Sequence, residues 1–228
     1  MDRGTRRFVV PFLTVSRVQQ TLDGIVLRTH DVGEADRLCV VLTKERGRMA
    51  MRARAVRKLG SRMGALLLPG RRLTVDVRED GSYATVVAAR LNGEVADLSH
   101  PASFAAAQQG IELLLLLTED GEPLPEVFDA LFQFLHACGA GASRALLPFQ
   151  LRVFHVLGLL PGHAGDRRFA GLDEADRSAV RLCGTTGDFS LLCEAVGDSA
   201  GLRLFAADLL DMHAGRALKS DAVFAALA

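Results

Sequence analysis

The sequence lacks most of the features that mark a metal site, a disulfide-rich domain or a membrane segment. Its four cysteines are scattered, without paired spacing: Cys39, Cys138, Cys183 and Cys193. No run reaches the roughly 18 apolar residues that a membrane-spanning helix needs. The first residues show neither the long apolar region nor the cleavage site of a secretory leader. We therefore expect a cytoplasmic protein with reduced thiols, no metal, no cofactor and no membrane contact.

Patterns that would carry catalysis are also missing. The chain has neither the G-x-x-x-x-G-K-[ST] phosphate loop nor the glycine fingerprint of dinucleotide-binding proteins. His136 and Cys138 are two residues apart, so on a helix they point in different directions, and we expect Cys138 to be a core residue. An acidic run is typical of solvated surface: Glu119, Asp120, Glu122, Glu126 and Asp129. The sequence therefore predicts a protein without enzymatic activity.

Net charge is zero overall but unevenly distributed. Residues 1–72 contain 16 lysine and arginine residues against 6 acids, whereas residues 73–228 contain 11 against 21. Such asymmetry indicates nucleic-acid contact at one end of the molecule. Aromatic residues are scarce in the same region, because none of the 12 Phe lies between residues 21 and 95 and Tyr83 is the only other aromatic there. We therefore expect binding through charge, loose and blind to sequence, rather than through stacking on aromatics.

Much of the positive charge lies in one stretch, Lys44–Arg72. Its ten cations are the candidate DNA-binding residues: Lys44, Arg46, Arg48, Arg52, Arg54, Arg57, Lys58, Arg62, Arg71 and Arg72. Alternation over Met49–Ala55 predicts a strand with arginines on one face, followed by a basic loop. Such a surface suits a phosphate backbone, and a merely solubilising face is the alternative. If about five of these side chains pair with phosphates of a single strand, log K should fall with log salt at a slope of about −3.5.

Short strands precede a helical second half. Apolar or alternating residues between turns predict five strands: Gly24–His30, Asp36–Thr43, Arg48–Ala55, Arg72–Arg78 and Tyr83–Leu91. Five such strands suggest a small closed barrel. Helical spacing predicts the following helices: Phe104–Leu117, Pro125–Cys138, Ser143–Leu160, Leu172–Cys183, Leu191–Val196 and Leu202–His213, with a last turn after Ser220.

The fold class predicted from these elements is α+β. Pro148 should kink the third helix or mark its true start. Residues 162–171 are predicted to form a polar loop. We expect an N-terminal extension over residues 1–20, a barrel domain over residues 21–95 and a helical domain over residues 96–228.

The order of these features resembles the RecO family of bacterial recombination mediators. Five segments carry the likeness, in this order: GIVLRTHDVGEADRLCVVLTKERGRM, ARAVRKLGSR, LLLPGRRLTVDV, FQLRVFHVLGLLP and GRALKSDAVF. The resemblance implies an OB-fold barrel followed by a helical domain. It also implies binding to single- and double-stranded DNA, strand annealing, association with RecR, and docking of the acidic C-terminal tail of single-strand binding protein (SSB). Such proteins help load RecA onto SSB-coated single strands.

Two departures from the family pattern matter. Many members carry a four-cysteine zinc module after the segment that here ends at Pro161, but the residues that follow, GHAGDRRFAG, contain no cysteine. We expect no zinc, because a structural zinc site needs four thiolates or imidazoles in tetrahedral reach. The family's closing lysine-serine-arginine motif reads Lys219-Ser220-Asp221 here, which puts any contact of that arginine in doubt.

The predicted site for the SSB tail is Arg152, with Arg144 as its nearest helper. Arg152 lies in an apolar helix, at a position where the family has a basic residue. An acidic, apolar peptide end needs a cation beside an apolar pocket. A helix-surface charge with a snorkelling stem is the alternative.

Three hypotheses about function remain. The first is a non-enzymatic, nucleoid-associated mediator of recombinational DNA repair. The second is a generic OB-fold protein that binds single-stranded nucleic acid, RNA included, and has a helical interaction domain. The third is a small enzyme, which requires a cleft of converging titratable groups that the sequence does not indicate. Strand annealing in the presence of SSB separates the first two, because only a mediator should need the SSB tail.

Overall fold

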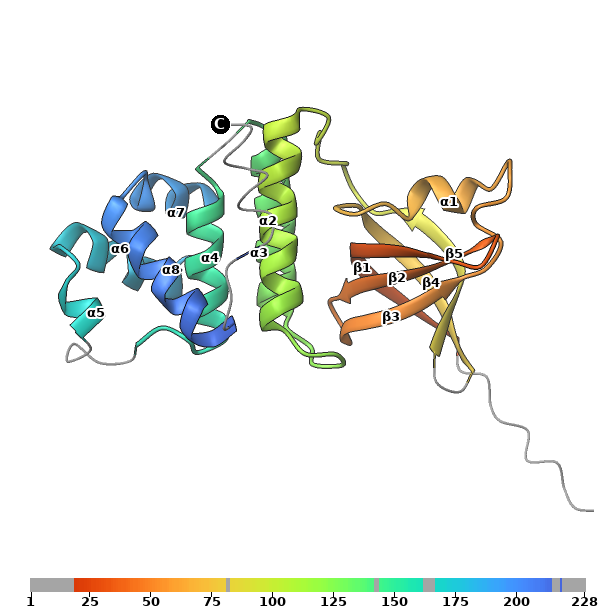
Figure 1. The fold of residues 1–228 in the computed structure, drawn as a ribbon, viewed down its shortest axis with the longest axis horizontal. Helices are drawn as coiled ribbons and strands as arrows, with labels where there is room; N and C mark the ends of the chain where they lie inside the picture. Colours follow the sequence, from red (N-terminus) through yellow and green to blue (C-terminus); the bar gives the residue numbers. More distant parts are fainter. Residues whose placement is uncertain (1–18, 81–82, 142–143, 162–166, 215–217, 219–228) are drawn as a thin grey trace, which may run out of the picture.

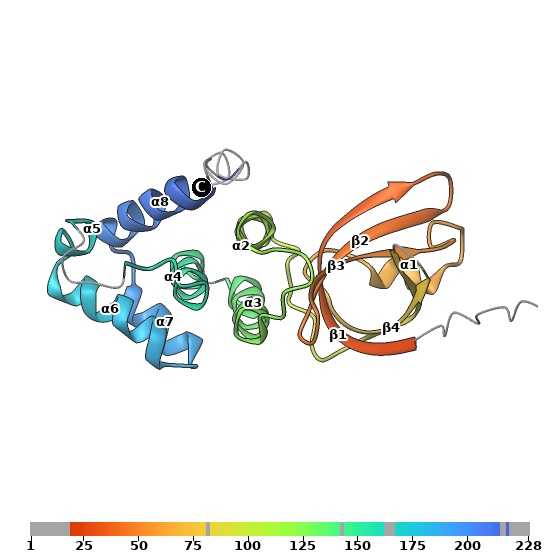
Figure 2. The ribbon, with the colours of Figure 1, turned by 90° about the horizontal axis from the view of Figure 1, so that it is seen from below.

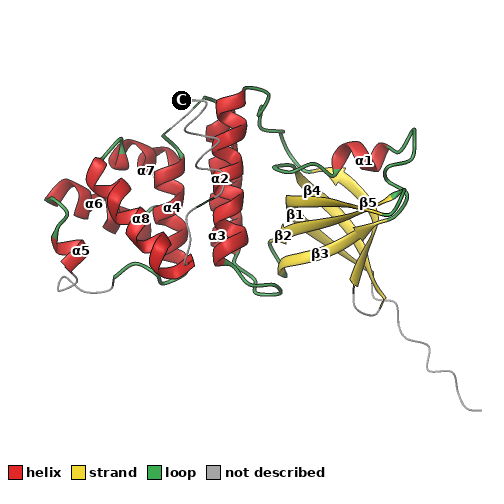
Figure 3. Cartoon of the chain, viewed as in Figure 1, coloured by secondary structure: helices red, strands yellow, loops and turns green. Residues whose placement is uncertain are grey.

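The structure, a computed structural model, describes residues 19–80, 83–141, 144–161, 167–214 and 218. Five strands close into a barrel, and a helical domain follows, as Figures 1 and 3 show. The predicted α+β class, a five-stranded OB-fold barrel followed by helices, is therefore confirmed.

The barrel has the strand order β1-β2-β3-β5-β4, with β4 returning to β1. Its strands are β1 (Gln19–Val32), β2 (Asp36–Thr43), β3 (Gly47–Ala53), β4 (Arg72–Asp80) and β5 (Tyr83–Leu91). β1 is long enough to pair with β4 through its first half and with β2 through its second, which closes the ring seen end-on in Figure 2. β3 and β5 pair in parallel, while the other pairs are antiparallel.

Alternation along β3 is confirmed up to Ala53. Met51 and Ala53 are fully buried in the barrel, and Arg52 between them is exposed. The strand ends at Ala53 rather than at Ala55, because Ala55 turns into the left-handed region with φ of 57°. β1 begins at Gln19, earlier than predicted, because Leu22 and its neighbours pair with β4.

The helices are α1 (Arg62–Leu66), α2 (Pro101–Leu117), α3 (Pro125–Gly139), α4 (Leu146–Val156), α5 (Arg167–Ala170), α6 (Glu174–Thr185), α7 (Phe189–Val196) and α8 (Ala200–Ala214). α2 and α3 lie between the barrel and helices α4–α8 in both Figure 1 and Figure 2, whereas α1 lies on the barrel. The helical core contains stacked rings of Phe134 and Phe149, 4.4 Å apart. Ile25, Leu27 and Leu42 of the barrel belong to the same apolar cluster, so the barrel and the helices share a core.

Some predicted helix boundaries are wrong. α4 ends at Val156 and not at Leu160, because the chain turns at Gly158, which has φ of 68°. Pro148 lies buried in the first turn of α4, where its missing N–H has no intrahelical partner to lose. α1, and α5 within the predicted loop over residues 162–171, were not predicted. Ser143 and the predicted turn after Ser220 lie outside the described residues. None of the described helices is long and apolar enough to cross a membrane.

Candidate nucleic-acid interface

The ten predicted DNA-binding cations do not form one surface, because the fold divides them between two sides of the barrel. The turn between β2 and β3 lies against the loop that joins α2 to α3. The segment between β3 and α1 lies on the side of the barrel away from those helices (Figure 1).

On the helical side, the cations pair with acids of the helical domain. Lys44 Nζ lies 2.8 Å from a carboxylate oxygen of Asp129 on α3. Arg48 pairs with Asp120 at 2.5 Å, and its guanidinium also donates to the backbone carbonyl of Leu115. Arg48 therefore has partners within the protein, and its predicted contact with DNA stays a prediction. Asp120 and Asp129 of the acidic run are exposed, as expected for solvated surface, and they also pair with these cations of the barrel.

The conformation of the turn Thr43–Gly47 allows it to pack closely against the α2–α3 loop. The Thr43 hydroxyl donates to the carbonyl of Gly47 and accepts from the N–H of Arg46, which closes the turn. Gly47 has φ of 65°, and a Cβ there would lie 1.9 Å from the carbonyl oxygen of Glu122. Glycine is therefore required twice, by its backbone conformation and by the approach of the α2–α3 loop.

Arg72 is held at the same junction. It makes two hydrogen bonds to Asp23, at 2.6 and 3.0 Å, and its guanidinium lies 4.5 Å from the ring centre of Phe132 on α3. The hydrogen bonds to Asp23 raise the pKa of Arg72 above its usual value. Arg46 is paired as well, with Glu79 at 2.7 Å. These two arginines have partners within the protein and are poorly placed to bind phosphate.

On the side of the barrel away from the helical domain, two arginines hold in place the loop that carries the other cations. Arg52 donates twice to one oxygen of Asp36, at 2.7 and 2.9 Å. The other oxygen of Asp36 accepts from the N–H of Ala55, and this bond, followed by that of Arg52, lowers the pKa of Asp36. Arg57 pairs with Asp31 at 3.1 Å and donates to the carbonyl of Gly33.

Three exposed cations on this side make no ion pair within contact distance among the described residues, although the charge of Arg54 contributes to the lowered pKa of Asp36. They are Arg54, Lys58 and Arg62. Nearby acids are Asp31, Glu34 and Asp36, so the positive excess there is modest. Arg71 is also without an acid partner in the described part of the chain, but it donates to the carbonyl of Ala65 in α1.

Sequence reasoning missed Arg37 and α1, which support this loop. Arg37 donates to the carbonyl of Gly64 in the middle of α1, to that of Leu67 just after the helix, and also to Asp31. Ser61 caps α1 by accepting from the N–H of Gly64. A capping serine before the helix was the available signal, although α1 is too short to show periodicity.

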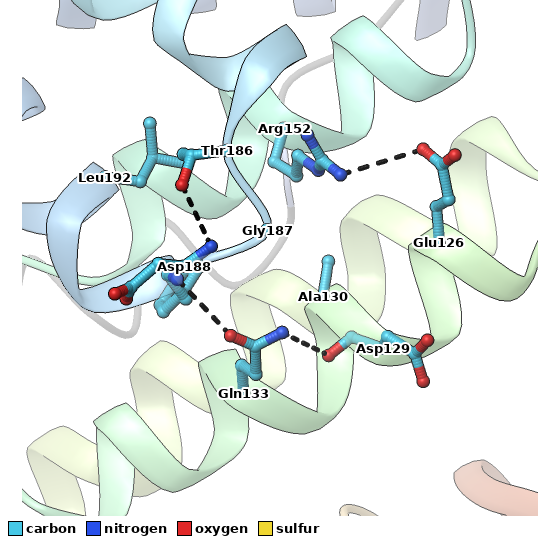
Figure 4. A pocket seen from close by; sticks show the side chains of 10 residues that line it. Glu126, Asp129, Ala130, Gln133, Arg152, Thr186, Gly187, Asp188 and Leu192 are labelled. Atoms are coloured by element: carbon cyan, nitrogen blue, oxygen red, sulfur yellow. Dashed lines mark hydrogen bonds and ion pairs between the residues drawn. The ribbon is translucent and has the colours of Figure 1, made fainter.

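Arg152 lies in a hollow of about 190 Å³ between α3, α4 and the start of α7 (Figure 4). Phe189 and Leu192 supply apolar lining. Arg152 donates to the carbonyl of Cys183 and lies 3.7 Å from Glu126. Two further carboxylates line the hollow, those of Asp129 and Asp188. The predicted cation therefore lies beside an apolar pocket, but among acids. Arg144 is exposed and is not among the lining residues.

A second hollow, of about 570 Å³, lies where the barrel meets the start of α2. Its lining includes Arg71 and three exposed apolar side chains, Leu68, Val95 and Phe104. Asp97 is the one acid among the lining residues, and it accepts the backbone N–H of Ser99. This hollow has an unpaired cation beside apolar surface.

The thiols are not arranged for nucleophilic chemistry. Burial raises the pKa of Cys138 and Cys183 to about 12 and that of Cys39 and Cys193 to about 11. They are therefore protonated at neutral pH. The prediction that Cys138 belongs to the core is confirmed, since it is 1% exposed. Across the described ranges, no three His, Cys, Asp or Glu side chains are grouped to hold a metal. The expected absence of zinc stays a prediction.

The fold and the basic loop define a class of protein, an OB-fold barrel joined to a helical domain. Two family models match the chain. The model described as "Recombination protein O N terminal" matches residues 17–93, and the model described as "Recombination protein O C terminal" matches residues 98–162. The chain belongs to the RecO family.

Curated relatives support the same family. A DNA repair protein RecO from Anaeromyxobacter sp. (strain K) is 35% identical over 148 residues, which cover 61% of this chain and 57% of the relative. The protein of that name from Myxococcus xanthus is 36% identical over 146 residues, with coverage of 61% and 59%. That from Bacillus pumilus is 28% identical over 142 residues, with coverage of 61% and 56%. The chain thus spans a little over half the length of these relatives.

Proposed function

We propose that this chain is a DNA-binding protein of recombinational DNA repair, which anneals single strands and helps load RecA onto SSB-coated DNA together with RecR. Membership of the RecO family supports the repair role, since the matched relatives are named as DNA repair proteins. It acts in the cytoplasm, at the nucleoid, on single- and double-stranded DNA. The observation that carries the DNA-binding role is a set of exposed cations without an ion-pair partner among the described residues: Arg54 and Lys58 on an anchored barrel loop, and Arg62 at the start of α1.

The strength of binding follows from how few cations are free. Of the ten candidates, Lys44, Arg48 and Arg72 are paired at the helical side, and Arg46 pairs with Glu79. Three contacts from the loop give a salt slope of about −2 on single strands, shallower than the −3.5 expected for about five. Binding is therefore weak and salt-sensitive, which suits strand exchange better than storage.

Charge reversal tests the DNA surface. The triple variant Arg54→Glu, Lys58→Glu and Arg62→Glu is compared with Lys44→Glu, which reverses a cation on the helical side. We expect the triple variant to lose binding to a labelled single strand at low salt, while Lys44→Glu binds as the wild type does. Equal loss in both would refute the division of the cations between two sides.

Annealing in the presence of SSB tests the mediator role. Complementary strands coated with SSB should anneal when the chain is added, and much more slowly when SSB lacks its acidic tail. RecA filament formation on SSB-coated DNA should likewise increase when the chain and RecR are added together. Annealing that is indifferent to the tail would instead favour the generic OB-fold binder.

For the tail, we propose docking beside Arg152, with Arg144 as a secondary contact. The Arg152–Glu126 pair is long, at 3.7 Å, and Glu126 is exposed, so a peptide carboxylate can compete for Arg152. An acidic tail peptide should bind more weakly to Arg152→Glu and more tightly to Glu126→Gln, because the second change removes a repelling carboxylate. Arg71→Glu tests the second hollow. Loss of binding in Arg71→Glu alone would move the tail to the junction of barrel and α2.

We also infer that the chain has no enzymatic activity. Support comes from the raised pKa values of its four thiols, which keep them protonated. Incubation with DNA, ATP and Mg²⁺ should leave both the DNA and the nucleotide intact. Cleavage that purifies with the chain through several columns would overturn this inference.

A further inference from the structure

Leu59 is the most exposed large apolar side chain of the described residues. Its relative exposure is 107%, whereas the next, Leu204 on α8, reaches 69%. Leu59 lies between β3 and α1, directly after Lys58. Gly60 follows it with φ of 85°, and a Cβ at Gly60 would have no neighbour within 4 Å. The leucine therefore lies on a basic loop, and nothing in the described part of the chain covers it.

The loop that carries Leu59 is firmly attached. Val56 is 4% exposed and packs into the barrel core. The N–H of Arg57 donates to the carbonyl of Ala35 at 3.0 Å. Gly64 approaches so closely that a Cβ there would lie 2.1 Å from the carbonyl oxygen of Val56. The exposure of Leu59 is thus set by contacts on both sides of it, and the side chain is presented before any partner binds.

We propose that Leu59 is an apolar wedge that packs against or between the bases of DNA held by the neighbouring cations. This inference rests on the proposed DNA-binding function. Apolar side chains that enter base steps are a known means by which proteins unstack DNA. The barrel region has almost no aromatic residues for stacking, with Tyr83 alone between residues 21 and 95. Leu59 supplies the apolar contact, while Lys58 and Arg62 beside it bind phosphate.

Other partners fit this loop less well. A single leucine is a poor lipid anchor, because even a myristoyl chain gives only marginal membrane binding. A stable protein interface needs a contiguous apolar patch, whereas the exposed neighbours of Leu59 in sequence include Arg57 and Lys58. A nucleic acid matches both features, because its phosphates are anionic and its bases are flat and apolar.

The test compares Leu59→Ala with Leu204→Ala, which shortens the other highly exposed leucine. Affinity for a single-stranded oligonucleotide is measured across salt, and a 2-aminopurine base in the oligonucleotide reports unstacking. We expect Leu59→Ala to bind about tenfold more weakly at every salt concentration, with an unchanged salt slope, since the lost contact is apolar. The fluorescence rise of 2-aminopurine should disappear as well. Lys58→Ala should instead reduce the magnitude of the salt slope by about 0.7, because it removes one phosphate contact. The fluorescence rise of 2-aminopurine should remain in this variant.

The outcomes separate the wedge from the proposed function. If the wild type binds DNA and Leu59→Ala binds equally tightly with the same fluorescence rise, the wedge is refuted and DNA binding stands. If the wild type binds no DNA, both fail. Leucine-dependent binding to anionic phosphatidylserine vesicles, without a DNA effect, would also overturn the wedge. The thermal midpoint of Leu59→Ala should match that of the wild type, because Leu59 packs against no other residue in the described ranges.

Discussion

Substituting alanine for Gly47 tests how the barrel docks on the helical domain. Gly47 and Gly33 both have positive φ, 65° and 58°, so alanine is strained at either position. They differ in their surroundings. A Cβ at Gly47 would lie 1.9 Å from the carbonyl oxygen of Glu122, whereas a Cβ at Gly33 meets nothing within 4 Å. Gly33→Ala therefore measures the backbone strain alone.

The two free energies of unfolding should differ clearly. Left-handed backbone costs an alanine about 1 kcal/mol, and we expect this loss for Gly33→Ala. Gly47→Ala adds the cost of moving a backbone segment, about 1–3 kcal/mol on the scale of overpacked cores. The total of about 2–4 kcal/mol corresponds to a fall in Tm of roughly 4–16 °C for a chain of this size.

Denaturant unfolding and thermal scans measure the difference. Asp120→Ala should lower the free energy of unfolding less in the Gly47→Ala background than in the wild type. The reason is that Gly47→Ala has already moved the α2–α3 loop away from Arg48. Equal losses for Gly33→Ala and Gly47→Ala, together with additive effects of Asp120→Ala, would refute the docking of this turn against Glu122.

Three further predictions concern packing, charge and pH. Gly110→Ala should destabilise the protein by about 1–3 kcal/mol in urea unfolding, because its Cβ would lie 2.2 Å from the ring of Phe134; a loss below that of Gly33→Ala would contradict it. A double-mutant cycle on Lys44 and Asp129, both exposed, should give a coupling of less than about 1 kcal/mol that shrinks with added salt, and a salt-independent coupling would contradict a surface pair. The four thiols should react slowly with iodoacetamide at pH 8 until urea is added. Because their folded pKa values of about 11–12 exceed the unfolded value, the stability they contribute is complete below pH 9 and falls as pH rises through 11 to 12, which urea midpoints at each pH would detect.

The fold could be predicted in outline because its signals are local. Alternation over β3 placed Met51 and Ala53 inside, and regular turns between short apolar runs indicated a closed barrel. Helix ends were harder, since the end of α4 depends on a turn at Gly158 that helical spacing does not reveal. α1 was not predicted because a helix of five residues is too short to show a helical spacing of apolar residues.

The candidate site could be predicted only as a collection of charges. The sequence identified the cations but could not say which of them meet carboxylates from elsewhere in the chain. Lys44 and Asp129 are 85 residues apart in sequence, and Arg48 and Asp120 are 72 apart, yet each pair is in contact. In the sequence the basic stretch and the acidic run are separate features, although in the structure they neutralise one another in part across the junction.

The sequence by itself determined that this chain is a barrel followed by helices, and that its cations gather in one segment, because strand periodicity and composition are properties of neighbouring residues. Only the tertiary structure decided that some of these cations join the barrel to the helices, while Arg54, Lys58 and Arg62 lie on the other side with Leu59 and without an ion-pair partner among the residues described. The physical reason is that charge pairing and exposure depend on distances between segments, and closure of the barrel sets those distances.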